Sequence, residues 1–179
     1  MEEDIKLYND FILGKNESFE KIIDKYKEKL IYFIQRFVKS IDIAEDISQD
    51  VFVYMLINKK EYDFKYSLKT YLYTIGKSRA LNYLKRESKI LPIDESNLYD
   101  DDLEEKIFYK ERTTNLKKAI NKLSSKYQLA IYLVDVEELQ YKDICKILNK
   151  SLPQVKMLIH RARKKLKYIL SQEVNKYEE

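Results

Sequence analysis

The chain has 179 residues and a formal net charge of +4, with 36% charged and 45% hydrophobic residues but only two glycines and two prolines. This length allows one or two small domains. The apolar–polar alternation and the glycine- and proline-punctuated short runs that mark β-strands are absent. We therefore expect an all-α protein of two small helical domains, each with enough hydrophobic residues for a core.

Composition also excludes several kinds of chemical site. Gly14 and Gly76 stand isolated, so a glycine-rich phosphate loop is excluded. The single cysteine and the single histidine, His160, form neither an internal disulfide nor a His/Cys metal cluster within a monomer. No pair of carboxylates stands out from an ordinary solvated helix surface. We expect no enzymatic activity, no metal and no cofactor.

Neither membrane insertion nor secretion is expected. The chain has no run of about 18 apolar residues. Its N-terminus, MEEDIKLYNDFILGK, is acidic and interrupted by charges, unlike a secretory signal. A single cysteine also fits a reducing compartment. These features predict a cytoplasmic protein.

Apolar residues spaced three and four apart predict the first two helices. A short helix over 3–13 ends at Gly14, which supplies a left-handed stop. A longer helix follows over 19–37, and we expect Ser18 or Asn16 to cap its N-terminus.

A third helix is predicted from Asp42, because Asp42 and Glu45 have the spacing of a capping box. Its buried side is expected to hold Ile47, Val51, Tyr54 and Met55. Its other side carries Asp46, Gln49, Asp50 and Val53.

Residues 58–66, NKKEYDFKY, break the pattern and predict an aromatic loop before a helix over 67–89. Four residues should anchor the first half of that helix: Leu68, Tyr71, Leu72 and Ile75. Residues 91–106 contain Pro92 and an acidic run, which predicts a flexible linker. The second domain should then contain helices over 107–122, 125–136, 140–148 and 152–172.

Charge is distributed unevenly along the chain. Residues 67–89 hold six basic residues against Glu87, and residues 142–170 hold nine against Asp143. Residues 94–105 hold seven acidic residues and no basic one. Two basic helices separated by an acidic linker indicate two nucleic-acid contacts.

The segment 140–170 has the pattern of a helix-turn-helix, which places its second helix in the DNA major groove. Asn149 suits a turn with positive φ, and Ser151 with Gln154 predicts a capping box. Val155 and Ile159 should face the core. The residues left to face outward are Gln154, Lys156, Met157, His160, Arg161, Lys164 and Lys165. The alternative is a basic amphipathic surface helix without a DNA target.

Three blocks carry a resemblance to a known family: IAEDISQDVFVYML at 43–56, SLKTYLYTIGKSRALNYLKRE at 67–87, and the segment from LSSKYQLAIYL to RARKKL at 123–166. Together they resemble sigma factors of the extracytoplasmic-function (ECF) type in the bacterial sigma-70 family. The resemblance implies sigma domain 2 over 1–90, the acidic linker over 91–106, and sigma domain 4 over 107–179. It also implies a function: directing core RNA polymerase to promoters and initiating transcription.

For the third helix, the resemblance implies polymerase docking. Asp46, Gln49 and Asp50 match the family's positions that bind the clamp helices of the polymerase β′ subunit. The alternative from composition alone is a solvated acidic face.

For the aromatic loop and the following helix, the resemblance implies reading and melting of the −10 element. Tyr62, Phe64 and Tyr66 can stack on an unpaired base. The alternative for Phe64 is a position in the core, which is where we place Tyr71. The helix would contribute Ser78, Arg79, Asn82 and Arg86. Gly76 is expected either to loosen this helix or to admit a close DNA approach.

For the helix-turn-helix, the resemblance implies −35 recognition and contact with the polymerase β flap. The matching readers are Lys156, Met157, His160 and Arg161. Arg163 and Lys164 are expected to contact phosphates, the alternative being that they only solubilise the helix. Family membership also implies an anti-sigma partner, membrane-bound in some cases. The rival interpretations are a stand-alone helix-turn-helix regulator, which leaves 43–87 unexplained, and a helical adaptor that contacts only protein.

Overall fold

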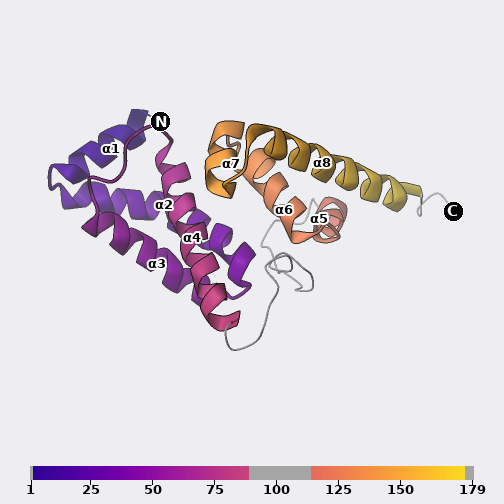
Figure 1. The fold of residues 1–179 in the computed structure, drawn as a ribbon, viewed down its shortest axis with the longest axis horizontal. Coiled ribbons are helices and arrows are strands. Elements are labelled where there is room, and N and C mark those ends of the chain that lie inside the picture. Colours follow the sequence, from indigo (N-terminus) through magenta and orange to yellow (C-terminus); the bar gives the residue numbers. More distant parts are fainter. Residues whose placement is uncertain (1, 89–113, 176–179) are drawn as a thin grey trace. The chain divides into compact units, whose positions relative to one another are not determined.

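The structure, a computed structural model, describes residues 2–88 and 114–175, whose helices are shown in Figure 1. The chain divides into two compact units. The first is built from α1 to α4, and the second contains α5, α6, η2, α8 and most of α7. Every element in the described ranges is helical, which confirms the all-α prediction.

The first unit is a bundle centred on α2. Its elements are α1 (Glu2–Ile12), α2 (Asn16–Val38), α3 (Ile41–Ile57) and α4 (Leu68–Ser88). α2 packs against each of the other three helices, and α3 also packs against α4. The loop 58–67 joins α3 to α4 and passes beside α1 (Figure 1).

The core of this unit is tightest where α4 crosses α2. Leu30 and Ile34 are fully buried on α2, and the Tyr73 ring of α4 stacks on Phe33 with centroids 4.2 Å apart. A Cβ added at Gly76 would lie 3.1 Å from Leu30 Cδ1. Close helix packing therefore accounts for the glycine, which faces α2.

Left-handed turns set the helix ends. Gly14 has φ +92° and ends α1 as predicted. The predicted caps of α2 were wrong: the helix begins at Asn16 behind the extended Lys15, and Ser18 is buried in its first turn. Once the backbone has turned at Gly14, one extended residue is enough to restart the helix.

The α3 cap also differs from the sequence prediction. Ser40 is the N-cap, and its Oγ accepts from the Ile43 N–H at 3.4 Å, whereas Asp42 lies inside the first turn. Lys39 ends α2 in the left-handed conformation at φ 61°. This turn brings Ser40 into the extended geometry of an N-cap two residues earlier than expected.

The second unit contains α5 (Thr114–Asn121), α6 (Ser125–Ile131), the π-helix η2 (Tyr132–Val136), most of α7 (Tyr141–Leu148) and α8 (Leu152–Asn175). α8 packs against α5 and α6. The helix predicted over 125–136 is present, but its second half is a π-turn. There the Glu137 N–H donates to the Tyr132 carbonyl, and the Tyr132 hydroxyl donates to the Glu137 carboxylate at 2.6 Å.

The predicted linker, and residues 107–113 of the helix predicted over 107–122, lie outside the described residues. Within 2–88 and 114–175, no helix has both the length and the hydropathy of a membrane span.

Candidate nucleic-acid and protein interfaces

α3 presents a mixed acidic and apolar face to solvent. Asp46, Gln49 and Asp50 are exposed, while Ile47 and Val51 of the same helix are buried. The face continues along the helix into Val53, which is 51% exposed, and Ile57, which is 74% exposed. Unpartnered apolar side chains beside carboxylates are typical of a protein-docking surface with a basic partner.

A polar cluster links this face to α4. Arg79 Nη1 lies 3.5 Å from Asp50 Oδ2, and its guanidinium carbon lies 5.3 Å from the centroid of the Tyr54 ring. The Tyr54 hydroxyl donates to the Glu61 carboxylate, and this hydrogen bond raises the pKa of Tyr54. Tyr54 was predicted to be buried, but it is only half-buried because it carries this cluster.

The loop 58–67 does not expose all three of its predicted aromatic side chains. Tyr62 is only 4% exposed, and its hydroxyl donates to the Tyr66 carbonyl at 2.7 Å. Phe64 is 36% exposed and adopts φ +59°. Tyr66 is half-buried. Tyr62 thus lies in the interior of the unit, and Phe64 and Tyr66 are the rings of this set with exposed surface.

Tyr8 of α1 contacts the same loop and was not singled out from the sequence. It is fully buried, its hydroxyl donates to the Lys59 carbonyl at 3.1 Å, and its ring lies 4.7 Å from that of Tyr62. Burial is the main cause that raises its pKa to about 12, so the hydroxyl stays protonated near neutral pH. Helical spacing alone could not indicate that Tyr8 contacts the loop.

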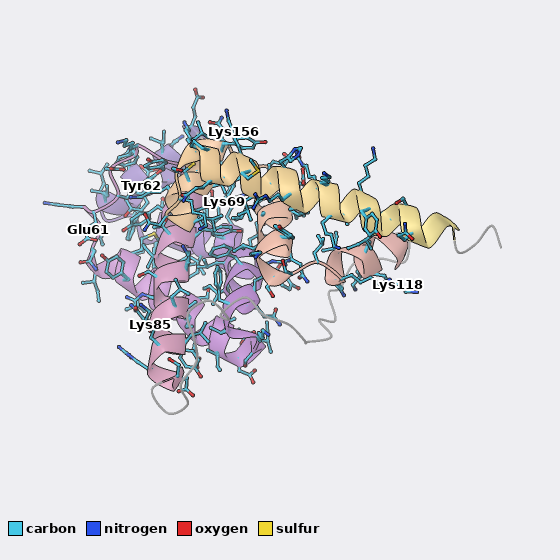
Figure 2. The ribbon with its side chains drawn as sticks, turned by 45° about the vertical axis from the view of Figure 1, so that its right-hand side comes forward. Glu61, Tyr62, Lys69, Lys85, Lys118 and Lys156 are labelled. Atoms are coloured by element: carbon cyan, nitrogen blue, oxygen red, sulfur yellow. The ribbon has the colours of Figure 1, made fainter. Side chains whose placement is uncertain are left out.

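On α4, the predicted DNA contacts share one exposed side. Ser78, Asn82 and Arg86 are exposed at intervals of four residues, which places them on one helix face. Arg79 is one-third exposed and is held by Asp50 and Tyr54. Lys85 extends the basic surface at the C-terminal end of the helix (Figure 2).

The four residues predicted to anchor α4 differ in their burial. Leu68 and Leu72 are fully buried as predicted, whereas Tyr71 and Ile75 are half-buried. The Tyr71 hydroxyl is buried without a hydrogen-bond partner, and its ring lies 5.1 Å from that of Tyr62. Desolvation by burial raises the pKa of Tyr71. Tyr71 thus belongs to the aromatic cluster behind the loop.

α8 begins with the predicted turn. Asn149 has φ +53°, and the Ser151 N–H donates to Gln154 Oε1 at 2.9 Å, which supplies one half of the capping box. Val155 and Ile159 are buried as predicted. All seven residues predicted to face outward are exposed: Gln154, Lys156, Met157, His160, Arg161, Lys164 and Lys165. Lys156 projects near the start of this helix in Figure 2.

Arg163 differs from its neighbours on α8 because it has a partner within the unit. Its guanidinium donates to both carboxylate oxygens of Asp135 in η2. This hydrogen bond is the main cause that raises the pKa of Arg163. Asp135 was not identified from the sequence. Its pairing reduces the availability of Arg163 for a phosphate.

Comparison with known proteins accounts for both units. Residues 22–90 match the family "Sigma-70 region 2", and residues 113–166 match "Sigma-70, region 4". The chain belongs to the sigma-70 family. Region 2 thus contains α3, the loop and α4, and region 4 contains the helix-turn-helix.

Full-length relatives place it with the ECF-type sigma factors. It is 27% identical over 167 residues to the ECF RNA polymerase sigma factor SigW of Bacillus subtilis, covering 86% of this chain and 89% of SigW. It is 29% identical over 157 residues to the RNA polymerase sigma factor YlaC of the same organism, covering 84% and 91%.

A solved sigma factor shares the fold. The sigma factor RpoE from Bartonella quintana, crystallised with the anti-sigma factor NepR, superposes with a TM-score of 0.66 at 21% identity. The superposition covers 87% of this chain and 98% of RpoE.

Proposed function

We propose that this chain is an ECF-type sigma factor that directs core bacterial RNA polymerase to specific promoters and initiates transcription there. One observation carries the proposal: a single chain holds an exposed acidic and apolar face on α3 and an exposed basic helix, α8, within the segments that match sigma-70 regions 2 and 4. The chain itself catalyses no reaction, because the polymerase forms the phosphodiester bonds. It therefore works in the cytoplasm with the polymerase.

The α3 face would bind the polymerase. Asp46, Gln49 and Asp50 offer hydrogen-bond acceptors to a basic partner, and Val53 extends the contact with apolar surface. An apolar centre with charged neighbours supplies both affinity and orientation. The β′ clamp helices are the partner that this face would take.

The loop 58–67 and α4 would recognise the −10 element. Phe64 and Tyr66 are the stacking candidates, since Tyr62 is buried beneath them. A stacked base gains about 1–3 kcal/mol, which compares with the few kcal/mol needed to unstack it. Ser78, Asn82 and Arg86 would contact the DNA strand next to the stacked base. Arg79 would add a further contact once its ion pair with Asp50 opens.

The −35 element falls to α8. Lys156, Met157, His160 and Arg161 are exposed near its N-terminal end, which is the part of a recognition helix that reaches base edges. Lys164 suits a phosphate, and Arg163 is a phosphate contact only when Asp135 releases it. The polymerase β flap is the protein partner of this region.

An anti-sigma factor is a further partner in this proposal. The structurally similar RpoE was solved with one, NepR. The rival stand-alone regulator is not favoured, because it leaves the α3 face and the family match of residues 22–90 without a role.

Run-off transcription tests the function directly. Core RNA polymerase is supplied with the chain and with the DNA upstream of the chain's own gene. We expect a discrete start site that requires both core enzyme and chain. Unchanged start sites with and without the chain, on this DNA and on a genomic library, would refute the proposal.

A further inference from the structure

α1 lies before the residues that match sigma-70 region 2, yet it contacts the loop proposed to read the −10 element. Tyr8 makes this contact. Its hydroxyl donates to the Lys59 carbonyl at 3.1 Å, and its ring meets Tyr62 edge-on at 4.7 Å and Phe64 edge-on at 5.8 Å between centroids. One side chain of α1 thus holds the loop at three positions.

α1 is fixed to α2 by contacts other than those of Tyr8. The Phe11 ring stacks on Phe19 of α2, with centroids 4.9 Å apart. Lys25 Nζ of α2 lies 2.6 Å from Glu3 and 2.8 Å from Asp4. The helix is therefore anchored to α2, and Tyr8 can hold the loop against it.

The loop needs such a support because Phe64 has an unfavourable backbone. Its φ of +59° is rarely adopted by a bulky L-residue. Such a conformation persists only where the surroundings determine it. For Phe64 these surroundings are the rings of Tyr8 and Tyr62, and Tyr62 is itself held by Tyr8.

We infer that Tyr8 is a positioning residue for promoter melting: α1 holds the loop 58–67 in the shape that presents Phe64 to an unstacked base of the non-template strand. This inference rests on the proposed function. Its physical basis is preorganisation, since a loop ordered during folding does not have to be ordered when DNA binds. Tyr8 is fully buried, so its side chain offers no surface to nucleic acid.

The test measures binding of a single-stranded non-template oligonucleotide across the −10 region of a promoter mapped with the wild-type holoenzyme. Holoenzymes carry the wild-type chain, Tyr8→Leu or Phe19→Leu. Both variants replace a ring in the α1–α2 region, but Phe19 stacks on Phe11 and not on the loop rings. We expect Tyr8→Leu to bind about tenfold more weakly, the loss of one base stack. Leucine keeps an apolar contact with Phe11, and Lys25 still pairs with Glu3 and Asp4, so α1 stays on α2 and Phe19→Leu should bind like the wild type.

Abasic substitutions in the oligonucleotide identify the contact that is lost. Removing the captured base should weaken wild-type binding about tenfold. It should not weaken Tyr8→Leu further, because that variant no longer presents the ring. Equal oligonucleotide affinities for Tyr8→Leu and Phe19→Leu, or retained abasic sensitivity in Tyr8→Leu, would overturn the inference.

A milder variant covers the case in which Tyr8→Leu fails to fold. Tyr8→Phe keeps the ring and removes the hydrogen bond to Lys59, so binding should weaken by roughly two- to tenfold. Amide hydrogen exchange at Glu61 and Lys65 should accelerate, because their donors bond within this loop. Unchanged exchange and unchanged binding would overturn the inference. A wild-type holoenzyme that binds the oligonucleotide no better than core alone would instead overturn the proposed function.

Discussion

Arg163 illustrates how a single contact changes the expected role of a residue. On the helical surface it stands beside the proposed readers of α8, yet its guanidinium is paired with Asp135. The two side chains are 50% and 40% exposed, so the pair contributes less than about 1 kcal/mol to stability. Its consequence is for DNA binding, because it removes a cation that a phosphate could use.

Replacing Asp135 with asparagine should free the Arg163 guanidinium to contact a DNA phosphate. In Asp135→Asn holoenzyme, the slope of log K against log salt should be steeper by about one unit, the value for one extra phosphate contact. Glu138→Gln is the matched control, because Glu138 is exposed and lies in the same segment. Equal slopes for the two variants and the wild type would contradict this account, because releasing Arg163 from Asp135 would then add no phosphate contact.

Sequence reasoning at this scale succeeded where helical periodicity decides and failed where contacts are distant. Exposure along α8 and the buried Val155 and Ile159 followed from the 3.6-residue period. The Asp135–Arg163 pair spans 28 residues, and Tyr8 meets the Lys59 carbonyl across 51. The local sequence does not indicate such pairs. For the same reason Tyr62 was predicted to be exposed, although its contact with the distant Tyr8 buries it.

At the scale of elements, α3 depends on a cap that the sequence did not single out. Ser40→Ala should weaken the first turn by about 1 kcal/mol, because the Ile43 N–H loses its acceptor. Hydrogen exchange of that amide in the full chain should accelerate about fivefold. Asp42→Asn is the comparison and should change it less, since Asp42 acts only through the helix dipole. A larger effect for Asp42→Asn would restore Asp42 as the cap.

Gly76 tests the packing of α4 on α2. Alanine has about 1 kcal/mol better helix propensity than glycine, but its Cβ would lie 3.1 Å from Leu30 Cδ1 and 3.3 Å from Ile34 Cδ1. Both neighbours are fully buried, so overpacking should win. We expect Gly76→Ala to lower the free energy of unfolding by about 1 kcal/mol, measured by exchange of the slowest amides of α2.

A second variant separates packing from backbone effects at the same position. Leu30→Val removes the Cδ1 atom nearest the new methyl group, so the double variant should be more stable than the sum of the two single changes predicts. Strict additivity, or a Gly76→Ala variant more stable than the wild type, would contradict the packing account.

Element positions were largely predictable, and their ends were less so. Helices α2, α3, α4 and α8 lie where apolar spacing placed them. The N-caps Lys15 and Ser40 follow left-handed residues, Gly14 and Lys39 respectively. Of these two left-handed residues, only the glycine is recognisable from the sequence. The π-turn at Tyr132 depends on a buried hydrogen bond to Glu137 that no periodicity encodes.

At the scale of the whole chain, the proposed mechanism divides DNA recognition between two units. Each unit alone offers a small surface, α4 with its loop or the N-terminal part of α8. Polymerase would hold both on one promoter, so that the second contact forms at an effective concentration in the millimolar range, of order 1 mM. Specific promoter binding should therefore require the core enzyme.

Promoter binding with and without core polymerase, compared across charge variants of α3, tests this claim most directly. One variant combines Asp46→Lys, Gln49→Lys and Asp50→Lys. Its control combines Glu20→Lys, Asp24→Lys and Glu28→Gln, which makes the same change in net charge on exposed positions of α2.

The measurement is fluorescence anisotropy of labelled promoter DNA competed with unrelated DNA. We predict competitor-resistant binding by the wild type and the control only when core enzyme is present, and none by the α3 variant in either condition. Tight sequence-specific binding by the chain alone, undiminished in the α3 variant, would contradict the account.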